Sequence, residues 1–140
     1  MDKQNSNIKE LTKAEEQVMQ ILWDIRKGFV KDILDKMPEP KPAYNTVSTI
    51  VRILEKKGFV SYKAYGKTHE YFPLIEKDEY RSFSLRSLMK NYFGGKIEKM
   101  VSFFARENKM DANELERLIY FVQQDIDKEE SKNENNERDN

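Results

Sequence analysis

The chain has 140 residues, of which 38% are hydrophobic and 36% are charged, with basic and acidic side chains in equal number. It contains no cysteine and one histidine, which excludes disulfides, thiolate metal sites and a thiol nucleophile. No segment approaches the roughly 20 apolar residues that span a bilayer, and residues 1–10 resemble no signal peptide. We therefore expect a cytoplasmic protein with no cofactor, no metal and no membrane insertion.

The balanced net charge conceals two segments of opposite sign. Residues 41–71 contain six basic side chains against two acidic ones, whereas residues 123–140 contain seven acidic side chains against three basic ones. A basic segment of this kind is typical of nucleic-acid binding. An acidic tail disfavours non-specific contact with DNA.

The first two helices are predicted from caps and from apolar spacing. Residues 1–8 show neither signal, and we expect them to be disordered. Thr12 followed by Glu15 forms a capping box, which marks a helix start. The helix should end near Gly28, because glycine is favoured just past a helix C-terminus. The same helical spacing of apolar residues over the shorter segment 29–37 predicts a second helix. A proline-rich connector follows it.

The stretch that begins at Ala43 predicts a third helix with two different faces, ending at the Lys56-Lys57-Gly58 sequence. At ~100° per residue, one face is apolar: Tyr44, Val47, Ile50, Val51 and Leu54. The opposite face has an amide, a hydroxyl, a guanidinium and an ammonium group, and no carboxylate: Asn45, Thr49, Arg52 and Lys56. Such groups bind base edges and phosphates in a DNA major groove, so we interpret this helix as a recognition helix.

Position along the recognition helix indicates the partner of each polar residue. The N-terminal part of such a helix enters the groove, so we expect Asn45 and Thr49 to contact base edges. The later and flanking residues are expected to contact phosphates: Thr46, Ser48, Arg52 and Lys56. An ordinary solvated helix surface has a similar composition, and the segment that follows favours DNA contact over it.

Two runs rich in aromatic and β-branched residues, 59–63 and 69–72, predict short strands joined at Gly66. Such a wing lies along the DNA backbone, and three of its residues are the candidate contacts: Lys63, Lys67 and Thr68. We interpret His69 as a structural or exposed strand residue. The predicted fold class is mainly α with a small β-wing, a winged helix-turn-helix DNA-binding domain over residues 9–75 followed by a helical dimerisation region.

Residues 76–128 are predicted to form that dimerisation domain, and residues 129–140 a disordered acidic and polar tail. The helices of 76–128 have more apolar side chains than they can bury on one another, so we expect a homodimer. A twofold partner would place two recognition helices on one face of DNA. The predicted dimerisation residues are Tyr92, Phe93, Met100, Phe104, Leu115, Leu118, Ile119 and Val122.

Three segments of the sequence are similar to the penicillinase-repressor family (BlaI/MecI type) and to its copper-operon relatives (CopY type): LTKAEEQVMQILW, NTVSTIVRILEKKGFV and the glycine-lysine wing followed by YFP. The resemblance covers roughly residues 11–127. It implies a homodimeric repressor, with an N-terminal winged helix, that occupies a palindromic operator in double-stranded DNA. In the β-lactam-resistance branch it also implies release by cleavage of the C-terminal region, triggered by a sensor metalloprotease.

The sequence departs from the family pattern at two places. The copper branch binds metal through a C-terminal cysteine cluster, and a chain without cysteine cannot sense metal in that way. The resistance branch is cut between an asparagine and a phenylalanine in the helix that matches residues 96–107. This chain has Ser102-Phe103-Phe104 there and no asparagine, so we take these three residues as the candidate cleavage region.

Two other functions are compatible with parts of the sequence. A winged helix can be a protein-interaction module without DNA binding, and would then present carboxylates or apolar groups on its recognition face. A hydrolase could use His69 as a base, but would need a nucleophile and an orienting acid beside it. We expect no enzymatic activity, because nothing in the sequence resembles a nucleophile elbow.

Overall fold

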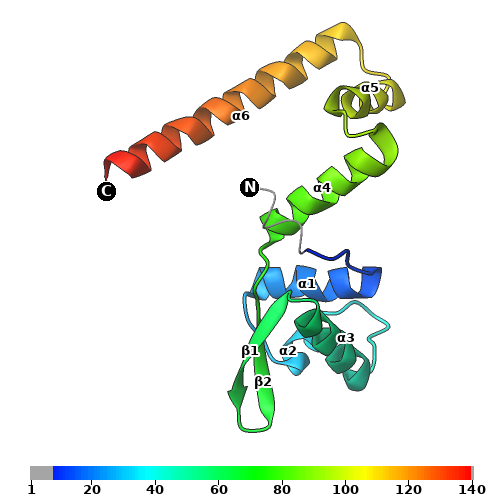
Figure 1. Cartoon of the computed structure of the whole chain (residues 1–140), viewed down its shortest axis with the longest axis vertical. Helices are drawn as coiled ribbons and strands as arrows, with labels where there is room; N and C mark the ends of the chain where they lie inside the picture. The colour runs from blue at the N-terminus through cyan, green and yellow to red at the C-terminus, as the bar shows by residue number, and fades with distance from the viewer. Residues whose placement is uncertain (1–7, 140) are drawn as a thin grey trace. The chain divides into compact units, whose positions relative to one another are not determined.

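We describe a computed structural model of the chain over residues 8–139 (Figure 1). Its elements are α1 (Lys13–Ile25), α2 (Val30–Asp35), α3 (Tyr44–Lys56), β1 (Val60–Tyr65), β2 (Thr68–Pro73), α4 (Lys77–Phe93), α5 (Ile97–Glu107) and α6 (Ala112–Arg138). The predicted fold class, mainly α with a small β-wing, is confirmed. Contacts divide the chain into two units, one ending at Leu88 and the other beginning at Met89.

The start of α1 is the predicted capping box. The Thr12 hydroxyl accepts a hydrogen bond from the Glu15 backbone N–H at 3.2 Å, and the Glu15 carboxylate accepts one from the Thr12 N–H at 3.0 Å. The helix ends at Ile25, earlier than predicted, with Arg26 at a φ of 71°. Gly28 exchanges two backbone hydrogen bonds with Tyr71 of the wing instead, at 2.9 and 2.8 Å.

Gly28 has a packing reason to be glycine. A Cβ atom at this position would lie 2.8 Å from the Cδ1 atom of Ile25 and 3.2 Å from the Cβ of Asp32. A side chain at this position would therefore require the end of the Ile25 side chain and the Cβ of Asp32 to shift. This glycine joins the wing to the helices and does not cap α1.

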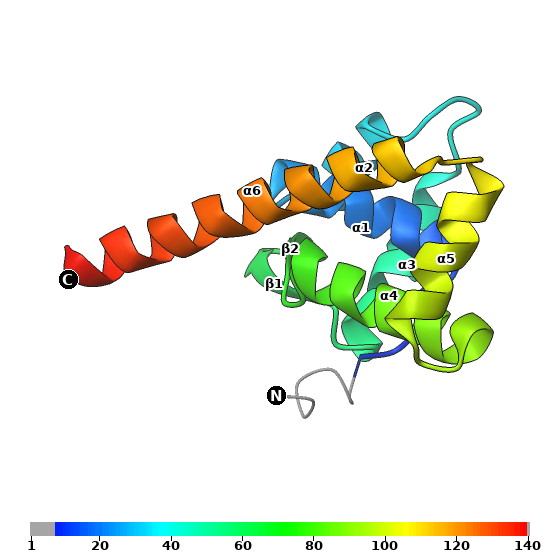
Figure 2. The ribbon, with the colours of Figure 1, turned by 90° about the horizontal axis from the view of Figure 1, so that it is seen from above.

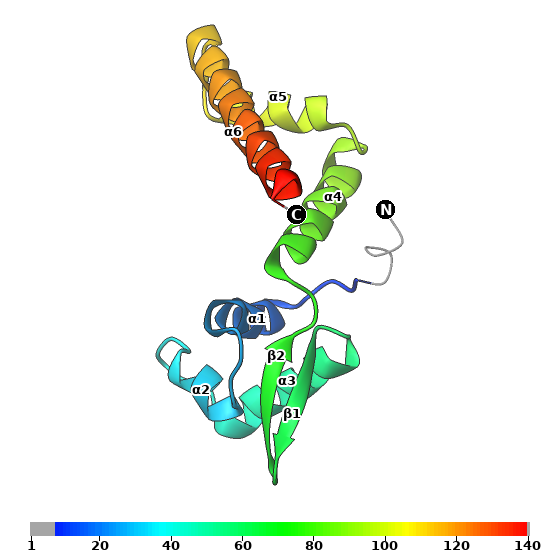
Figure 3. The ribbon, with the colours of Figure 1, turned by 90° about the vertical axis from the view of Figure 1, so that its left-hand side faces the viewer.

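The core of the first unit lies between α1, α2, α3 and the start of the wing. Its fully buried residues come from all of these elements: Val18, Met19, Leu22, Ile33, Val47, Val51, Leu54, Phe59 and Val60. The apolar face predicted for α3 supplies three of them. The two strands are antiparallel, with Tyr62 opposite Tyr71 and Ala64 opposite His69. Figures 1 and 3 show the hairpin beside α3, with its turn at the end far from α1.

Most of α4, up to Leu88, belongs to the winged-helix unit, whereas the predicted domain boundary lies between residues 75 and 76. The Tyr80 ring packs 5.6 Å from Phe59 and 6.2 Å from Trp23, measured between ring centroids. Its hydroxyl accepts a hydrogen bond from the Leu11 N–H at 2.9 Å. The contacts of this tyrosine explain why the unit extends to Leu88.

The second unit contains the end of α4, α5 and α6. Gly94 and Gly95 both have positive φ values and end α4. Within α5 and α6 no side chain is buried. None of the helices in residues 8–139 is long and apolar enough to cross a membrane.

The two chain ends that were expected to be disordered differ from each other in the structure. Residues 1–7 lie outside the described part of the chain, but Ile8 is buried in the core. Residues 129–138, predicted to be disordered, continue α6 as one uninterrupted helix (Figure 2). The polarity of this stretch was interpreted as disorder, although its glutamate, lysine and arginine residues are good helix formers and it contains no glycine or proline.

Candidate nucleic-acid interface

The outer face of α3 is polar and exposed. Asn45, Thr46, Thr49, Arg52 and Lys56 are all exposed, and Ser48 is half-buried. Tyr44, which the sequence pattern assigned to the apolar face, is 51% exposed. Tyr44 is the first residue of α3, whereas Val47, the next residue of the predicted apolar face, is fully buried.

Two hydrogen bonds within α3 orient its polar side chains. The Thr49 hydroxyl donates to the Asn45 backbone carbonyl at 2.9 Å, which leaves its oxygen available only as an acceptor. The Arg52 guanidinium donates to the Ser48 hydroxyl at 3.0 Å. Ser48 therefore holds Arg52 along the helix, on the side that faces the wing.

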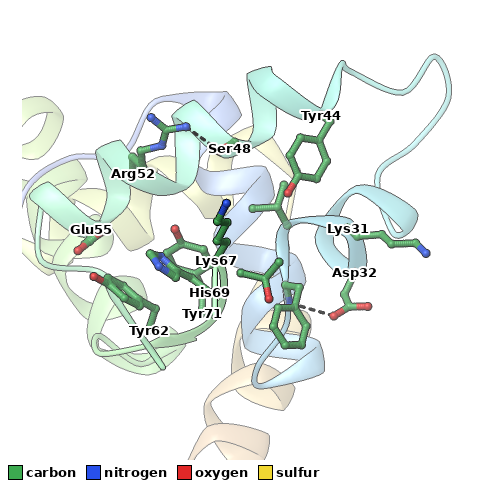
Figure 4. A pocket seen from close by; sticks show the side chains of 13 residues that line it. Lys31, Asp32, Tyr44, Ser48, Arg52, Glu55, Tyr62, Lys67, His69 and Tyr71 are labelled. Atoms are coloured by element: carbon green, nitrogen blue, oxygen red, sulfur yellow. Dashed lines mark hydrogen bonds between the residues drawn. The ribbon is translucent and has the colours of Figure 1, made fainter. Parts of the chain in front are cut away.

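A cleft of about 670 Å³ separates α3 from the wing, with α2 at one end (Figure 4). It brings together four of the predicted DNA-binding residues: Ser48, Arg52, Lys67 and Thr68. The other predicted residues of α3 do not line it. Lys63 does not line it either. Its ammonium group lies over the Tyr65 ring, 5.3 Å from the centroid.

The cleft also contains residues that the sequence prediction did not assign to the interface. They are Lys31 from α2, Tyr44 from α3, and Tyr62, His69 and Tyr71 from the wing. Strand alternation was a signal for the last three, because residues two apart on a strand share a face. His69 and Tyr71 have this spacing on β2, and Tyr71 pairs with Tyr62 of β1.

Three ring side chains of the wing, Tyr62, His69 and Tyr71, form one cluster in this cleft. The rings of Tyr62 and His69 stack with centroids 4.0 Å apart and planes 4° apart, and His69 lies edge-on to Tyr71 at 6.1 Å. Burial raises the pKa of the Tyr71 hydroxyl, and the Glu55 carboxylate raises it further. Tyr71 therefore stays protonated in neutral solution and can donate a hydrogen bond.

Two carboxylates lie among the basic groups of the cleft, Asp32 and Glu55. Asp32 accepts a hydrogen bond from the Phe29 backbone N–H at 2.9 Å and caps α2. Across residues 8–139, His69 makes no hydrogen bond to a serine or to a carboxylate. The nucleophile–base–acid arrangement that a hydrolase needs is thus not formed around this histidine.

Lys57 is basic but lies away from the interface. Its ammonium group forms a 2.6 Å ion pair with the Glu15 carboxylate and also donates to the Glu10 carbonyl. Burial acts to raise the pKa of Glu15, but hydrogen bonds from Lys57 and from Thr12 outweigh it, so the pKa is lowered. This pair joins the end of α3 to the start of α1.

The predicted dimerisation residues lie in the second unit, and most of them are exposed. Tyr92, Phe104, Leu118, Ile119 and Val122 are exposed, whereas Phe93, Met100 and Leu115 are half-buried. The candidate cleavage region, Ser102 to Phe104, is exposed and helical within α5. The Phe103 ring packs against Phe93 with centroids 5.6 Å apart.

Comparison with known proteins identifies the family. The family model described as the penicillinase repressor matches residues 11–124. The methicillin resistance regulatory protein MecI of Staphylococcus aureus strain N315 is 24% identical over 110 residues, which cover 78% of this chain and 89% of that protein. The penicillinase repressor of Bacillus licheniformis is 22% identical over 118 residues, covering 84% and 92%. The solution structure of the DNA-binding domain of the repressor BlaI is 23% identical, covers 52% of this chain and 90% of that one, and has a TM-score of 0.46. Because the family model spans most of the sequence, this chain belongs to the penicillinase repressor family.

Proposed function

We propose that the chain is a cytoplasmic, dimeric transcriptional repressor that binds a palindromic operator in double-stranded DNA. Family membership supports a DNA-binding repressor. The observation that carries the proposal is the set of exposed polar side chains on α3, Arg52 among them, which Lys67 and Thr68 of the wing continue across the cleft. The proposal gives the chain no enzymatic activity.

The residues of the recognition helix and the wing contact two parts of the DNA, base edges and phosphates. Asn45 and Thr49 lie at the start of α3 and reach base edges, where Asn45 can pair with an adenine and discriminate by ~1–3 kcal/mol. Thr46, Ser48, Arg52 and Lys56 of α3, and Lys63, Lys67 and Thr68 of the wing, contact phosphates. Phosphate contacts supply most of the affinity and make it fall as salt rises.

The exposed apolar side chains of α5 and α6 support the dimer. Phe104, Ile119 and Phe121 are each more than half exposed, and an amphipathic helix gains most of its stability by burying its apolar face. A second copy of the same unit would cover these residues by symmetry. The two recognition helices would then bind two half-sites, one helical turn or a multiple apart.

Cleavage between Ser102 and Phe104 is the release mechanism that we propose, with a sensor metalloprotease as the partner. A protease requires an extended substrate, so this part of α5 must unwind locally before it is cut. Scission would separate α6 from the rest of the dimerisation residues. The dimer, and with it the avidity for two half-sites, would then be lost.

A selection experiment tests the proposal. Duplexes enriched by the chain from a random pool should contain a palindrome. Binding to the most enriched duplex should weaken steeply as the salt concentration is raised. Failure to enrich any sequence above non-specific binding would instead favour a protein-interaction module. If Asn45→Ala loses the preference for particular base pairs in this selection, Asn45 contacts those bases.

A further inference from the structure

His69 occupies a defined position inside the cleft. Its ring is half-buried and stacked on Tyr62, with Tyr71 at its edge (Figure 4). Within residues 8–139 neither imidazole nitrogen has a hydrogen-bond partner. Packing therefore fixes the ring, while its two polar atoms stay available to a ligand.

The charged groups around His69 come from all three elements that border the cleft. They are Arg52 and Glu55 from α3, Lys67 from the wing, and Lys31 and Asp32 from α2, together with the phenols Tyr44, Tyr62 and Tyr71. Asp32 is already engaged at the start of α2. The remaining charged groups of α3 and the wing in this cleft are two cations, Arg52 and Lys67, and one carboxylate, Glu55.

A bound phosphate would reverse this balance. Arg52 and Lys67 lie on opposite walls of the cleft, one on α3 and one on the wing. An anion between them would neutralise both charges and, as a negative group beside His69, would favour a positive charge on its imidazole. It would also accept a hydrogen bond from the imidazolium N–H. The Tyr62 ring, stacked at 4.0 Å, would further favour the cationic form by a cation–π interaction.

We propose that His69 is a proton-coupled phosphate contact: the cleft receives a phosphodiester group of the DNA backbone, and His69 gains a proton from solvent as the DNA binds. This inference rests on the proposed DNA-binding function and adds a regulatory property to it. Proton binding and DNA binding then strengthen each other by the same factor. Because the histidine pKa is higher in the complex, the extra affinity is present at low pH and is lost as the pH rises through that value.

The wild-type chain allows a direct test, because His69 is its only histidine. The imidazole proton resonances can be titrated by NMR in the free chain and in its complex with a duplex selected from the random pool. We expect the titration midpoint to be higher in the complex. A rise of the midpoint by about one pH unit corresponds to an affinity that is about tenfold higher per protomer at low pH. An identical midpoint in the two states would overturn the inference.

Affinity measurements between pH 6 and 8 give a second test. For the wild type we expect binding to tighten as the pH falls, and for His69→Gln we expect no such trend. Lys63→Gln is the matched control, because Lys63 is a proposed phosphate contact that does not line the cleft: it should weaken binding and lower the salt dependence, but keep the tightening at low pH. A His69→Gln profile that follows the wild-type profile would contradict the role of His69.

The outcomes separate the inference from the function on which it rests. If the wild type binds its selected duplex with the same affinity from pH 6 to pH 8, the repressor proposal stands and the proton-coupled contact is wrong. If the wild type enriches and binds no duplex at any of these pH values, both proposals fail.

Discussion

The two units of this chain bury their apolar side chains to very different extents. Every buried hydrophobic residue of the described chain lies between Ile8 and Tyr80. In α5 and α6, by contrast, no side chain is buried, and Phe104, Ile119 and Phe121 stand more than half exposed. The difference separates a unit that completes its own core from one that leaves apolar side chains exposed, as the proposed dimer requires.

This contrast assigns different physical roles to apolar residues of similar type. Leu54 of α3 stabilises the fold of a single chain, because it is fully buried. Leu118 of α6 is 38% exposed, and the proposed partner would bury the rest of its side chain. Stability in the first unit should therefore be independent of protein concentration, whereas the structure of the second unit should depend on it.

The largest effect is expected at the dimer interface. Leu118→Asp places a charge where the second copy would pack, so the chain should become monomeric. Operator affinity should then fall by about 10²–10⁴-fold, since avidity between two half-sites is lost. Sedimentation and operator binding measure the two quantities. Lys132→Asp, which adds a carboxylate to the polar end of α6, should change neither; an intact dimer in Leu118→Asp would disprove this placement of the interface.

The next effect is expected in the core of the winged helix. Leu54→Ala should lower the free energy of unfolding by about 2–5 kcal/mol, because it removes buried methyl groups and leaves a cavity. The fluorescence of Trp23, the only tryptophan, reports this unit during urea unfolding. Ile53→Ala, at the exposed neighbouring position, should change the free energy of unfolding by no more than about 0.5 kcal/mol. Equal losses in the two variants would mean that the burial of α3 is wrongly assigned.

Within the first unit, features differ in how far the sequence alone predicts them. The apolar period of α3 and the Thr12–Glu15 capping box are local signals, and they predicted the helices of the first unit correctly. Gly28 was predicted as a helix cap, because nothing nearby in the sequence indicates its pairing with Tyr71. Only part of the cleft lining was predicted. The exposure of Tyr44 depends on how α3 packs against its neighbours, and the presence of His69 in the cleft depends on the strand register.

A smaller effect is expected from the ion pair that joins α1 to α3. Glu15→Gln should lower the free energy of unfolding at neutral pH by about 1–3 kcal/mol, because the half-buried Lys57 ammonium loses its charged partner. Since the pKa of Glu15 is lowered in the folded state, its contribution is present above the ordinary carboxyl pKa. It is lost as the pH falls through the folded-state value.

The pH dependence of unfolding, followed by Trp23 fluorescence, measures this contribution. The difference between wild type and Glu15→Gln should shrink as the solution becomes acidic. Glu16→Gln, in the same turn but exposed, should match the wild type throughout. A Glu15→Gln deficit that persists undiminished in acid would show that the ion pair is not its cause.

The smallest effect is expected at a single phosphate contact. Arg52→Ala should weaken binding to all sequences and reduce the slope of log affinity against log salt by about one unit per lost contact. Asn45→Ala should instead leave the slope unchanged and alter the base preference. If the slope of Arg52→Ala equals that of the wild type, Arg52 does not contact a phosphate.

One measurement tests most directly whether the winged helix acts as half of a dimeric repressor. Sedimentation of the chain, alone and with a palindromic duplex selected from the random pool, gives the number of chains in each species. We expect a dimer in free solution and one dimer on each duplex. A monomer in solution that binds the duplex as a single copy would contradict the twofold arrangement and the role of α5 and α6.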